Sequence, residues 1–330
     1  MSLPTRKIGF ADVPYPGLGC MSMTAFYSPH LTSEARNHAV LKAAFDAGCR
    51  HWDTANVYTG NEVMLGNAIK VLGIDRKELF LATKFGLTFE GGNLVSNGKP
   101  EYAKACLEQS LENLQTDYID LFYLHRVDAQ TPIEETVKAL KQAQEAGKIR
   151  YIGLSECSAA TLRRASAVAK ISAVQMEYSM WETSIETSGL LDACKELGVA
   201  VVAYSPLGRG LLTGQIKSRS DIDPADGRLT MPRFSEDNFP KNLELVDLVK
   251  EFAAKKGCTP GQLALAWVHA QWDHVLAIPG TTRVEALEEN IASVKVVLSK
   301  EELTQIRILL ETFTPSGDRY NEQMAALSNI

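Results

Sequence analysis

The sequence predicts an α/β fold, a (β/α)8 barrel of the TIM type, with a single domain spanning residues 1–330. Short apolar segments of strand length alternate with helix-like segments, and eight strands in such an alternation predict a closed parallel barrel. Barrels of this kind commonly reach this length as one domain. The alternative is an open doubly wound sheet, but its dinucleotide-binding glycine pattern is missing. The segment Gly208–Gly214 approaches that pattern with its third glycine one place late.

The chain begins with a predicted β-hairpin, in which Lys7–Phe10 and Val13–Tyr15 flank a turn at Ala11-Asp12. Gly17–Met21 follows as the first barrel strand. Its glycines permit a close backbone approach, either to a ligand or to a neighbouring strand.

The rest of the chain continues the alternation. After Gly17–Met21, the predicted strands are 50–53, 79–83, 119–124, 150–154, 174–178, 199–204 and 275–278. The predicted helices are 33–47, 62–72, 100–114, 132–146, 159–169, 185–197, 243–256, 260–271 and 300–311. Proline near a helix start and glycine after its end support several of these boundaries.

Arg209–Lys241, after the seventh strand, breaks the rhythm with three prolines among many polar residues. A loop of this length is either a lid over a ligand or a passive surface insertion. Two helices, 243–256 and 260–271, then follow without a strand between them, so one of them is extra to the barrel. The helix 300–311 is a further addition, packed against the outside or the base.

Composition excludes several classes of protein. A net charge of −6 and a pI near 5.6 argue against a nucleic-acid partner. No apolar stretch approaches the roughly 20 residues that span a bilayer, and no signal peptide is recognisable. The six cysteines are scattered without a CxxC motif, which indicates reduced thiols and a cytoplasmic location. No cluster has zinc-ligand spacing, so we expect no metal.

Ionisable residues stand where three consecutive predicted strands end: Asp53, Lys84 and His125, with Tyr58 five residues after Asp53. Singly, such residues are more often turn or helix caps, or satisfied and solvated groups. In a parallel barrel, however, the carboxyl ends of the strands converge on one face. We therefore expect the four side chains to share a cavity, as a set able to move a proton at a carbonyl oxygen.

Two loops have the character of a phosphate site. Ser205–Gly208 follows the seventh strand and Ile278–Arg283 follows the eighth, and barrels often bind phosphate on these two loops. Small residues let backbone N–H groups approach an anion, and Arg283 stands near a helix start. A Pro-Gly pair alone is simply a turn, but the pairing of the two loops favours a site.

Asp53, Tyr58, Lys84 and His125, in this order and context, resemble the catalytic tetrad of the aldo-keto reductase superfamily. The resemblance runs from about Gly17 to Asn290. It implies reduction of an aldehyde or ketone with a nicotinamide dinucleotide, NADPH/NADP+, bound in extended form across the top of the barrel. It also implies that Tyr58 donates the proton, Lys84 lowers its pKa, Asp53 keeps Lys84 charged and His125 hydrogen-bonds the carbonyl oxygen.

The same resemblance implies a set of cofactor-binding residues: Gly19, Met21, Asp53, Ser155, Glu156, Gln175, Tyr204, Ser205, Pro206, Leu207, Gly208, Gly210, Ile278, Gly280, Thr281, Thr282, Arg283, Glu289 and Asn290. By their matches, Ser155 and Gln175 hold the carboxamide, Tyr204 stacks on the nicotinamide ring, 205–208 cradle the pyrophosphate, 281–283 lie near the 2′-phosphate, and 289–290 contact adenine.

Two positions depart from the family pattern. Glu156 follows Ser155 where an asparagine is usual, and we expect its carboxylate to accept a hydrogen bond from the carboxamide NH₂. Ala286 occupies a position where the family's reductases often carry arginine, so cationic contact with the 2′-phosphate rests on Arg283 and on the loop 209–241.

For the substrate, Gly317–Gln323, Tyr204–Gly214 and Val127–Glu135 are similar to segments of fungal pyridoxal reductases. The resemblance implies pyridoxal or another aromatic aldehyde as the small carbonyl substrate, with the C-terminal segment shaping its pocket. Potassium-channel β subunits are similar as well, and they offer the alternative of a cofactor-binding regulatory protein. The complete tetrad favours the enzyme.

Overall fold

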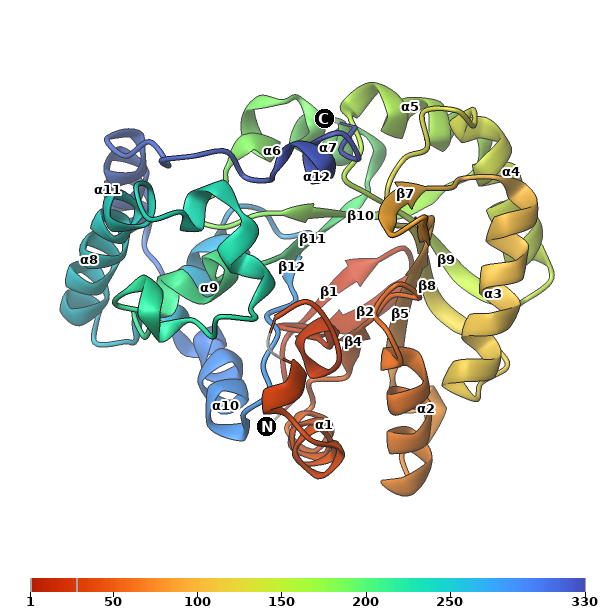
Figure 1. The fold of residues 1–330 in the computed structure, drawn as a ribbon, viewed down its shortest axis with the longest axis horizontal. Helices are drawn as coiled ribbons and strands as arrows, with labels where there is room; N and C mark the ends of the chain where they lie inside the picture. Colours follow the sequence, from red (N-terminus) through yellow and green to blue (C-terminus); the bar gives the residue numbers. More distant parts are fainter. Residues whose placement is uncertain (1, 28, 330) are drawn as a thin grey trace.

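The computed structural model describes residues 2–27 and 29–329. Eight parallel strands form one sheet in the order β3-β4-β5-β8-β9-β10-β11-β12. The two edges meet, because Gly17 N donates to Ala277 O at 2.9 Å and Gly19 N donates to Pro279 O at 3.2 Å. A parallel bridge between Gly19 and Gly280 completes this seam. Figure 1 shows the helices around the outside of the sheet, and the predicted (β/α)8 barrel is confirmed.

The barrel strands are β3 Leu18–Gly19, β4 His51–Asp53, β5 Phe80–Phe85, β8 Ile119–Leu124, β9 Ile149–Ser155, β10 Ile171–Glu177, β11 Ala200–Tyr204 and β12 Val275–Ala277. The helices are α1 Glu34–Asp46, α2 Asn61–Val71, α3 Pro100–Leu114, α4 Ile133–Glu145, α5 Ala159–Val168, α6 Ser184–Thr187, α7 Leu190–Leu197, α8 Phe239–Lys256, α9 Pro260–Ala270, α10 Val284–Ala292, α11 Lys300–Glu311 and α12 Glu322–Ala325.

An N-terminal hairpin of β1 (Thr5–Ile8) and β2 (Ala11–Pro14) covers the base of the barrel. Its turn lies at residues 9–10 and not at the predicted 11–12, because Gly9 takes the positive φ of +58° that the tight turn needs. Ile8 and Val13 pack into the barrel interior. Arg6 donates to the carbonyls of Trp272 at 2.9 Å and His269 at 2.7 Å, which ties the hairpin to the end of α9.

Three further segments differ from the sequence prediction. The helix expected over 185–197 is two helices, α6 and α7, because Gly189 with φ +77° interrupts it. Much of the predicted loop 209–241 consists of short 3-10 turns, and α8 begins already at Phe239. A second hairpin, β6 (Leu87–Glu90) and β7 (Asn93–Ser96), rises from the carboxyl end of β5 and was not predicted.

The inward and outward faces of the strands form separate cores. Leu121, Val202 and Leu276 belong to the barrel interior, whereas Phe122, Val201 and Val275 pack between sheet and helices. All six cysteines are free, and five are buried. Within the described residues, no helix is long and apolar enough to cross a membrane, and no cluster of His, Cys, Asp and Glu could hold a metal ion.

Candidate active site

The strand register brings the predicted catalytic side chains to one end of the barrel. Asp53 ends β4 and pairs with Gly19 on one side and Ala82 on the other. Side chains two residues apart share a face of a strand, so Lys84 points inward as Ala82 does. Lys84 pairs in turn with Tyr123 of β8, and His125 N donates to Phe85 O at 2.7 Å directly after that strand.

A buried ion pair lies at the centre of this end. Lys84 Nζ contacts Asp53 Oδ1 and donates to Thr54 O at 2.7 Å, with the Lys84 side chain completely shielded from solvent. Gln175 Nε2 donates to the other carboxylate oxygen of Asp53 at 2.8 Å. Burial alone would lower the pKa of Lys84, but Asp53 and Tyr58 outweigh it and raise that pKa. Lys84 is therefore a permanent cation in this site.

Tyr58 stands against this cation, with Lys84 Nζ 5.3 Å from the centre of its ring. Burial raises the pKa of the Tyr58 phenol, while Lys84 and Arg126 act in the opposite direction. The phenol is thus protonated at neutral pH, and the two cations stabilise the phenolate that forms when it gives up its proton. Lys84 thus acts on the pKa of Tyr58 in the expected direction, but burial outweighs it, and the net shift of that pKa is upward.

His125 lies beside Tyr58, with ring centroids 5.8 Å apart at an interplanar angle of 85°. Burial, together with Lys84 and Arg126, lowers the pKa of His125 well below its ordinary value. Its imidazole is therefore neutral at pH 7, with one N–H to donate. No described residue hydrogen-bonds the buried Nδ1 atom of His125. A neutral donor and a protonated phenol therefore face the same space.

That space is a cavity of about 660 Å³. The following predicted site residues line it: Gly19, Met21, Asp53, Tyr58, His125, Ser155, Gln175, Tyr204, Ser205, Pro206, Leu207, Gly210, Ile278, Gly280, Thr281, Arg283, Glu289 and Asn290. Four other predicted residues, Lys84, Glu156, Gly208 and Thr282, are not part of the lining. Lys84 lies behind the wall, where it contacts Asp53 and faces the ring of Tyr58.

Glu156 departs most from its expected role. Its side chain is completely buried, and its Oε1 atom accepts from Tyr204 OH at 2.8 Å. Its Oε2 atom forms an ion pair with Arg319 and lies 3.4 Å from Arg126 Nη1. Glu156 thus lies outside the cavity lining and is linked to the C-terminal segment, because arginine offers its carboxylate a strong, charged partner.

Several lining residues were missed in the sequence. Arg126 directly follows His125, and Leu87, Phe89 and Leu94 come from the unpredicted β6–β7 hairpin. A signal for the hairpin existed, since Gly91-Gly92 separates two segments of alternating character, and Gly-Gly is a two-residue hairpin turn. Arg126 carried no recognisable motif. Tyr320 lies in the C-terminal segment that the sequence had already associated with the substrate pocket.

Three buried histidines of the described chain predict a loss of stability in acid. Burial lowers the pKa of His51 and His269 to about 3, and that of His125 also falls. Below pH 6.5, the ordinary value, the unfolded chain binds protons that the folded chain does not. The free energy of unfolding should therefore fall by about 1.4 kcal/mol per pH unit for each of His51 and His269 as the pH drops from roughly 6.5 towards 3, and His125 acts in the same direction.

Urea unfolding at pH 7 and at pH 5 measures this slope. His269 Nε2 accepts from Ala277 N at 3.2 Å, so His269→Gln keeps an acceptor there while removing the titrating ring. The variant should have a flatter slope than the wild type. An identical slope would contradict the role of this histidine.

Comparisons with known proteins agree with this geometry. The model of the aldo/keto reductase family matches residues 17–311. Aldo-keto reductase yakc [NADP(+)] of Schizosaccharomyces pombe is 49% identical over 326 residues, covering 97% of this chain and 95% of that protein. Aldo-keto reductase str7 of Strobilurus tenacellus is 47% identical over 334 residues, covering 99% of this chain and 97% of that protein.

Solved structures point the same way. The glycerol dehydrogenase AKR11B4 of Gluconobacter oxydans superposes with a TM-score of 0.82 at 27% identity, covering 97% of this chain and 99% of that one. An aldo/keto reductase of Klebsiella pneumoniae in complex with NADP and acetate has a TM-score of 0.71 at 28% identity, covering 97% and 98%. Given this match over nearly its whole length, the chain belongs to the aldo/keto reductase family.

Proposed function

We propose that the protein reduces an aldehyde, pyridoxal or a related aromatic aldehyde, to the alcohol with NADPH. The observation that carries this proposal is the protonated phenol of Tyr58, held beside the buried Lys84–Asp53 pair where the cavity meets the strand ends. Family membership supports carbonyl chemistry in general, and yakc, a relative of similar length, is named as an NADP(+) enzyme.

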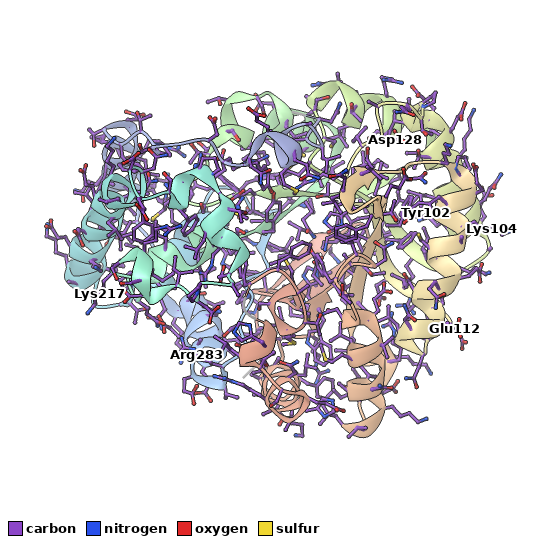
Figure 2. The ribbon with its side chains drawn as sticks, in the orientation of Figure 1. Tyr102, Lys104, Glu112, Asp128, Lys217 and Arg283 are labelled. Atoms are coloured by element: carbon purple, nitrogen blue, oxygen red, sulfur yellow. The ribbon has the colours of Figure 1, made fainter. Side chains whose placement is uncertain are left out.

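The cavity suits a dinucleotide. It extends from Tyr58 and Gln175 to Asn290 and to Arg283, which Figure 2 shows at the start of α10, on the opposite side of the molecule from Asp128. A Cβ atom at position 19 would lie 2.8 Å from Ile278 O and clash with it, so only glycine fits at this point of the cavity wall. The residues assigned to hold the cofactor are those of the predicted set that line the cavity.

The bound reduced nicotinamide supplies the hydride for the carbonyl carbon. Tyr58 donates its proton to the carbonyl oxygen, and the Lys84 ammonium stabilises the resulting phenolate. His125, neutral at pH 7, donates a hydrogen bond to the same oxygen and sets its angle. Asp53 keeps the buried ammonium charged, because an unpaired buried charge is costly.

The walls around the substrate position support an aromatic aldehyde with polar substituents. Phe26, Phe89 and Leu94 offer apolar surface for a ring, and they come from the loop after β3 and from the β6–β7 hairpin. On the side of the C-terminal segment, Tyr320 and Gln323 offer hydrogen-bonding groups. Pyridoxal combines an aromatic ring with hydroxyl groups, so its ring can pack on the apolar wall and its hydroxyl groups can form hydrogen bonds with the polar wall.

The test is NADPH oxidation measured with pyridoxal, benzaldehyde and an aliphatic aldehyde of similar size. We expect turnover with all three and the highest kcat/KM for pyridoxal. If kcat/KM is lower for pyridoxal than for benzaldehyde, the proposed reaction class still holds, but pyridoxal is rejected as the preferred substrate. NADPH binding without turnover of any carbonyl compound would overturn the proposed function.

Preference for NADPH over NADH is expected from the exposed Arg283, whose Nη2 atom donates to Gln215 Oε1 at 2.9 Å. A charge-assisted hydrogen bond is worth roughly 1.5–3 kcal/mol. Arg283→Ala should therefore weaken NADPH binding about ten- to a hundredfold and leave NADH binding nearly unchanged. Fluorescence titration measures both constants, with Arg283→Lys as the variant that keeps the charge. Equal losses for both cofactors would make Arg283 a structural residue.

We also propose that residues 1–330 act as one domain, because the N-terminal hairpin and the C-terminal segment both contact the barrel. The free cysteines support a cytoplasmic location.

A further inference from the structure

A buried cluster of charged residues lies at the cavity wall and extends behind it, and Arg126 and Arg209 of this cluster line the cavity. Glu156 and Glu177 are both buried, and Arg209 pairs with Glu177 through two hydrogen bonds of 3.1 and 2.7 Å. Arg319 pairs with Glu156 and lies 3.8 Å from Glu177. Arg126 Nη1 lies 3.4 Å from Glu156. Buried charges are costly unless they are paired, so each member depends on the others being in place.

Two tyrosines join this cluster to the cavity. Tyr204 donates to Glu156 Oε1 at 2.8 Å, and its hydroxyl lies 2.6 Å from that of Tyr320. Arg126 Nη2 donates to the Tyr320 hydroxyl at 3.1 Å, and Arg319 stacks on the Tyr320 ring at 4.6 Å. Both rings line the cavity. The hydroxyl of Tyr204 is therefore fixed on one side by Glu156 and on the other by a residue of the C-terminal segment.

The C-terminal segment has other attachments on either side of this contact. Ser316 N donates to Asn242 Oδ1 at 2.8 Å. Near the end of the chain, Asn329 Oδ1 accepts from Thr161 Oγ1 at 2.7 Å, and Asn329 forms a parallel bridge with Cys157. In Figure 1 the dark-blue segment runs from α11 to α12 and ends near α5. The segment is therefore held on both sides of Arg319 and Tyr320.

We propose that Arg319 and Tyr320 are positioning residues for Tyr204, joined to it by the buried carboxylate of Glu156. The C-terminal segment thereby sets the affinity of the nicotinamide end of the site. The proposal rests on the assignment of Tyr204 as the surface on which the nicotinamide ring stacks. A ring whose hydroxyl is already fixed loses little conformational freedom when a ligand stacks on it, so preorganisation raises affinity.

The proposal also explains the unusual residue at position 156. Arg319 is mostly buried, and a neutral asparagine at position 156 would leave its guanidinium without its closest carboxylate. The presence of a carboxylate at position 156 is thus explained by Arg319, although 163 positions separate the two residues in the chain.

A comparison of two ligands distinguishes this positioning role from a general loss of stability. NADPH reaches Tyr204, whereas adenosine 2′,5′-bisphosphate carries only the adenine and phosphate part of the cofactor. Arg319→Met and Glu156→Gln should each weaken NADPH binding about tenfold and leave adenosine 2′,5′-bisphosphate binding unchanged, measured by calorimetry on the full chain. The double variant should bind NADPH as tightly as the more affected single variant, because both substitutions break the same Glu156–Arg319 ion pair.

Tyr320→Phe is the milder variant, since it keeps the ring under Arg319 and removes only the hydroxyl. That hydroxyl has hydrogen bonds with Arg126 and with Tyr204, and the loss of the neutral one to Tyr204 should weaken NADPH binding about threefold. Arg307→Met removes the Arg307–Glu186 ion pair, which lies outside the cluster, and controls for a general loss of stability. It should change neither constant.

The outcomes distinguish this proposal from the assignment on which it rests. Equal weakening of both ligands in Arg319→Met, or unchanged NADPH binding in Arg319→Met and Tyr320→Phe, would overturn the positioning role. Tyr204→Ala tests the assignment itself and should weaken only NADPH binding. If it leaves NADPH binding unchanged, the stacking role of Tyr204 fails, and the positioning role fails with it.

Discussion

Replacing Tyr58 by phenylalanine should lower the turnover number at least a hundredfold while NADPH binding stays intact. The substitution keeps the ring that packs between Phe26 and His125 and faces Lys84, and it removes only the hydroxyl. General acid catalysis contributes typically 10²–10⁴-fold to a rate, so the loss should fall in that range.

Steady-state NADPH oxidation and a cofactor titration measure the two effects. Tyr102→Phe is a matched control, because Tyr102 of α3 (Figure 2) donates to Leu87 O at 3.3 Å and is not part of the cavity lining. It should turn over like the wild type. A Tyr58→Phe enzyme that retains more than about a tenth of wild-type turnover would rule out Tyr58 as the proton donor.

Lys84→Met should impair both catalysis and stability. The phenolate of Tyr58 loses its stabilising cation, so turnover should again fall at least a hundredfold. Asp53 is left as a buried carboxylate, and among the described residues Gln175 is then its one side-chain hydrogen-bond partner. Breaking a buried ion pair on one side typically costs about 3–5 kcal/mol, which should be visible as a lower melting temperature.

A second substitution separates these two effects. In Lys84→Met combined with Asp53→Asn, no buried charge is left unpaired at this point, so the melting temperature should recover while turnover stays low. In Lys84→Met combined with Tyr58→Phe, the losses in turnover should not multiply, because both act on one proton transfer. Multiplying losses would show that Lys84 has a catalytic effect independent of Tyr58.

The parts of the fold that follow local rules could be predicted from the sequence. Pro100 and Ser299 mark helix starts, and α3 and α11 have the predicted boundaries. The N-terminal turn was misplaced by two residues, because the glycine that takes a positive φ was read as part of a strand. The β6–β7 hairpin was missed because its two strands are only four residues long and interrupt the strand–helix alternation of the barrel.

The candidate site divides in the same way. Asp53, Lys84 and His125 could be found because each stands at a strand end, where the barrel itself brings distant positions together. The partner of Glu156 could not be found, because nothing near it in the chain indicates that Arg319 folds back over the barrel. Without that contact, a carboxylate next to Ser155 is naturally interpreted as a ligand of the cofactor.

The seam that closes the barrel links ligand binding to the integrity of the fold. β3 is only two residues long, and at the seam Gly17 N donates to the carbonyl of Ala277, the last residue of β12, and Gly19 N donates to that of Pro279. Short pairings of this kind open at lower free energy than long central strands. Gly19 and Gly280 also line the cavity, so a ligand that contacts both of them stabilises the closed barrel. If a ligand binds only the closed barrel, the free energy of unfolding of the protein rises with the logarithm of the ligand concentration once that concentration exceeds Kd.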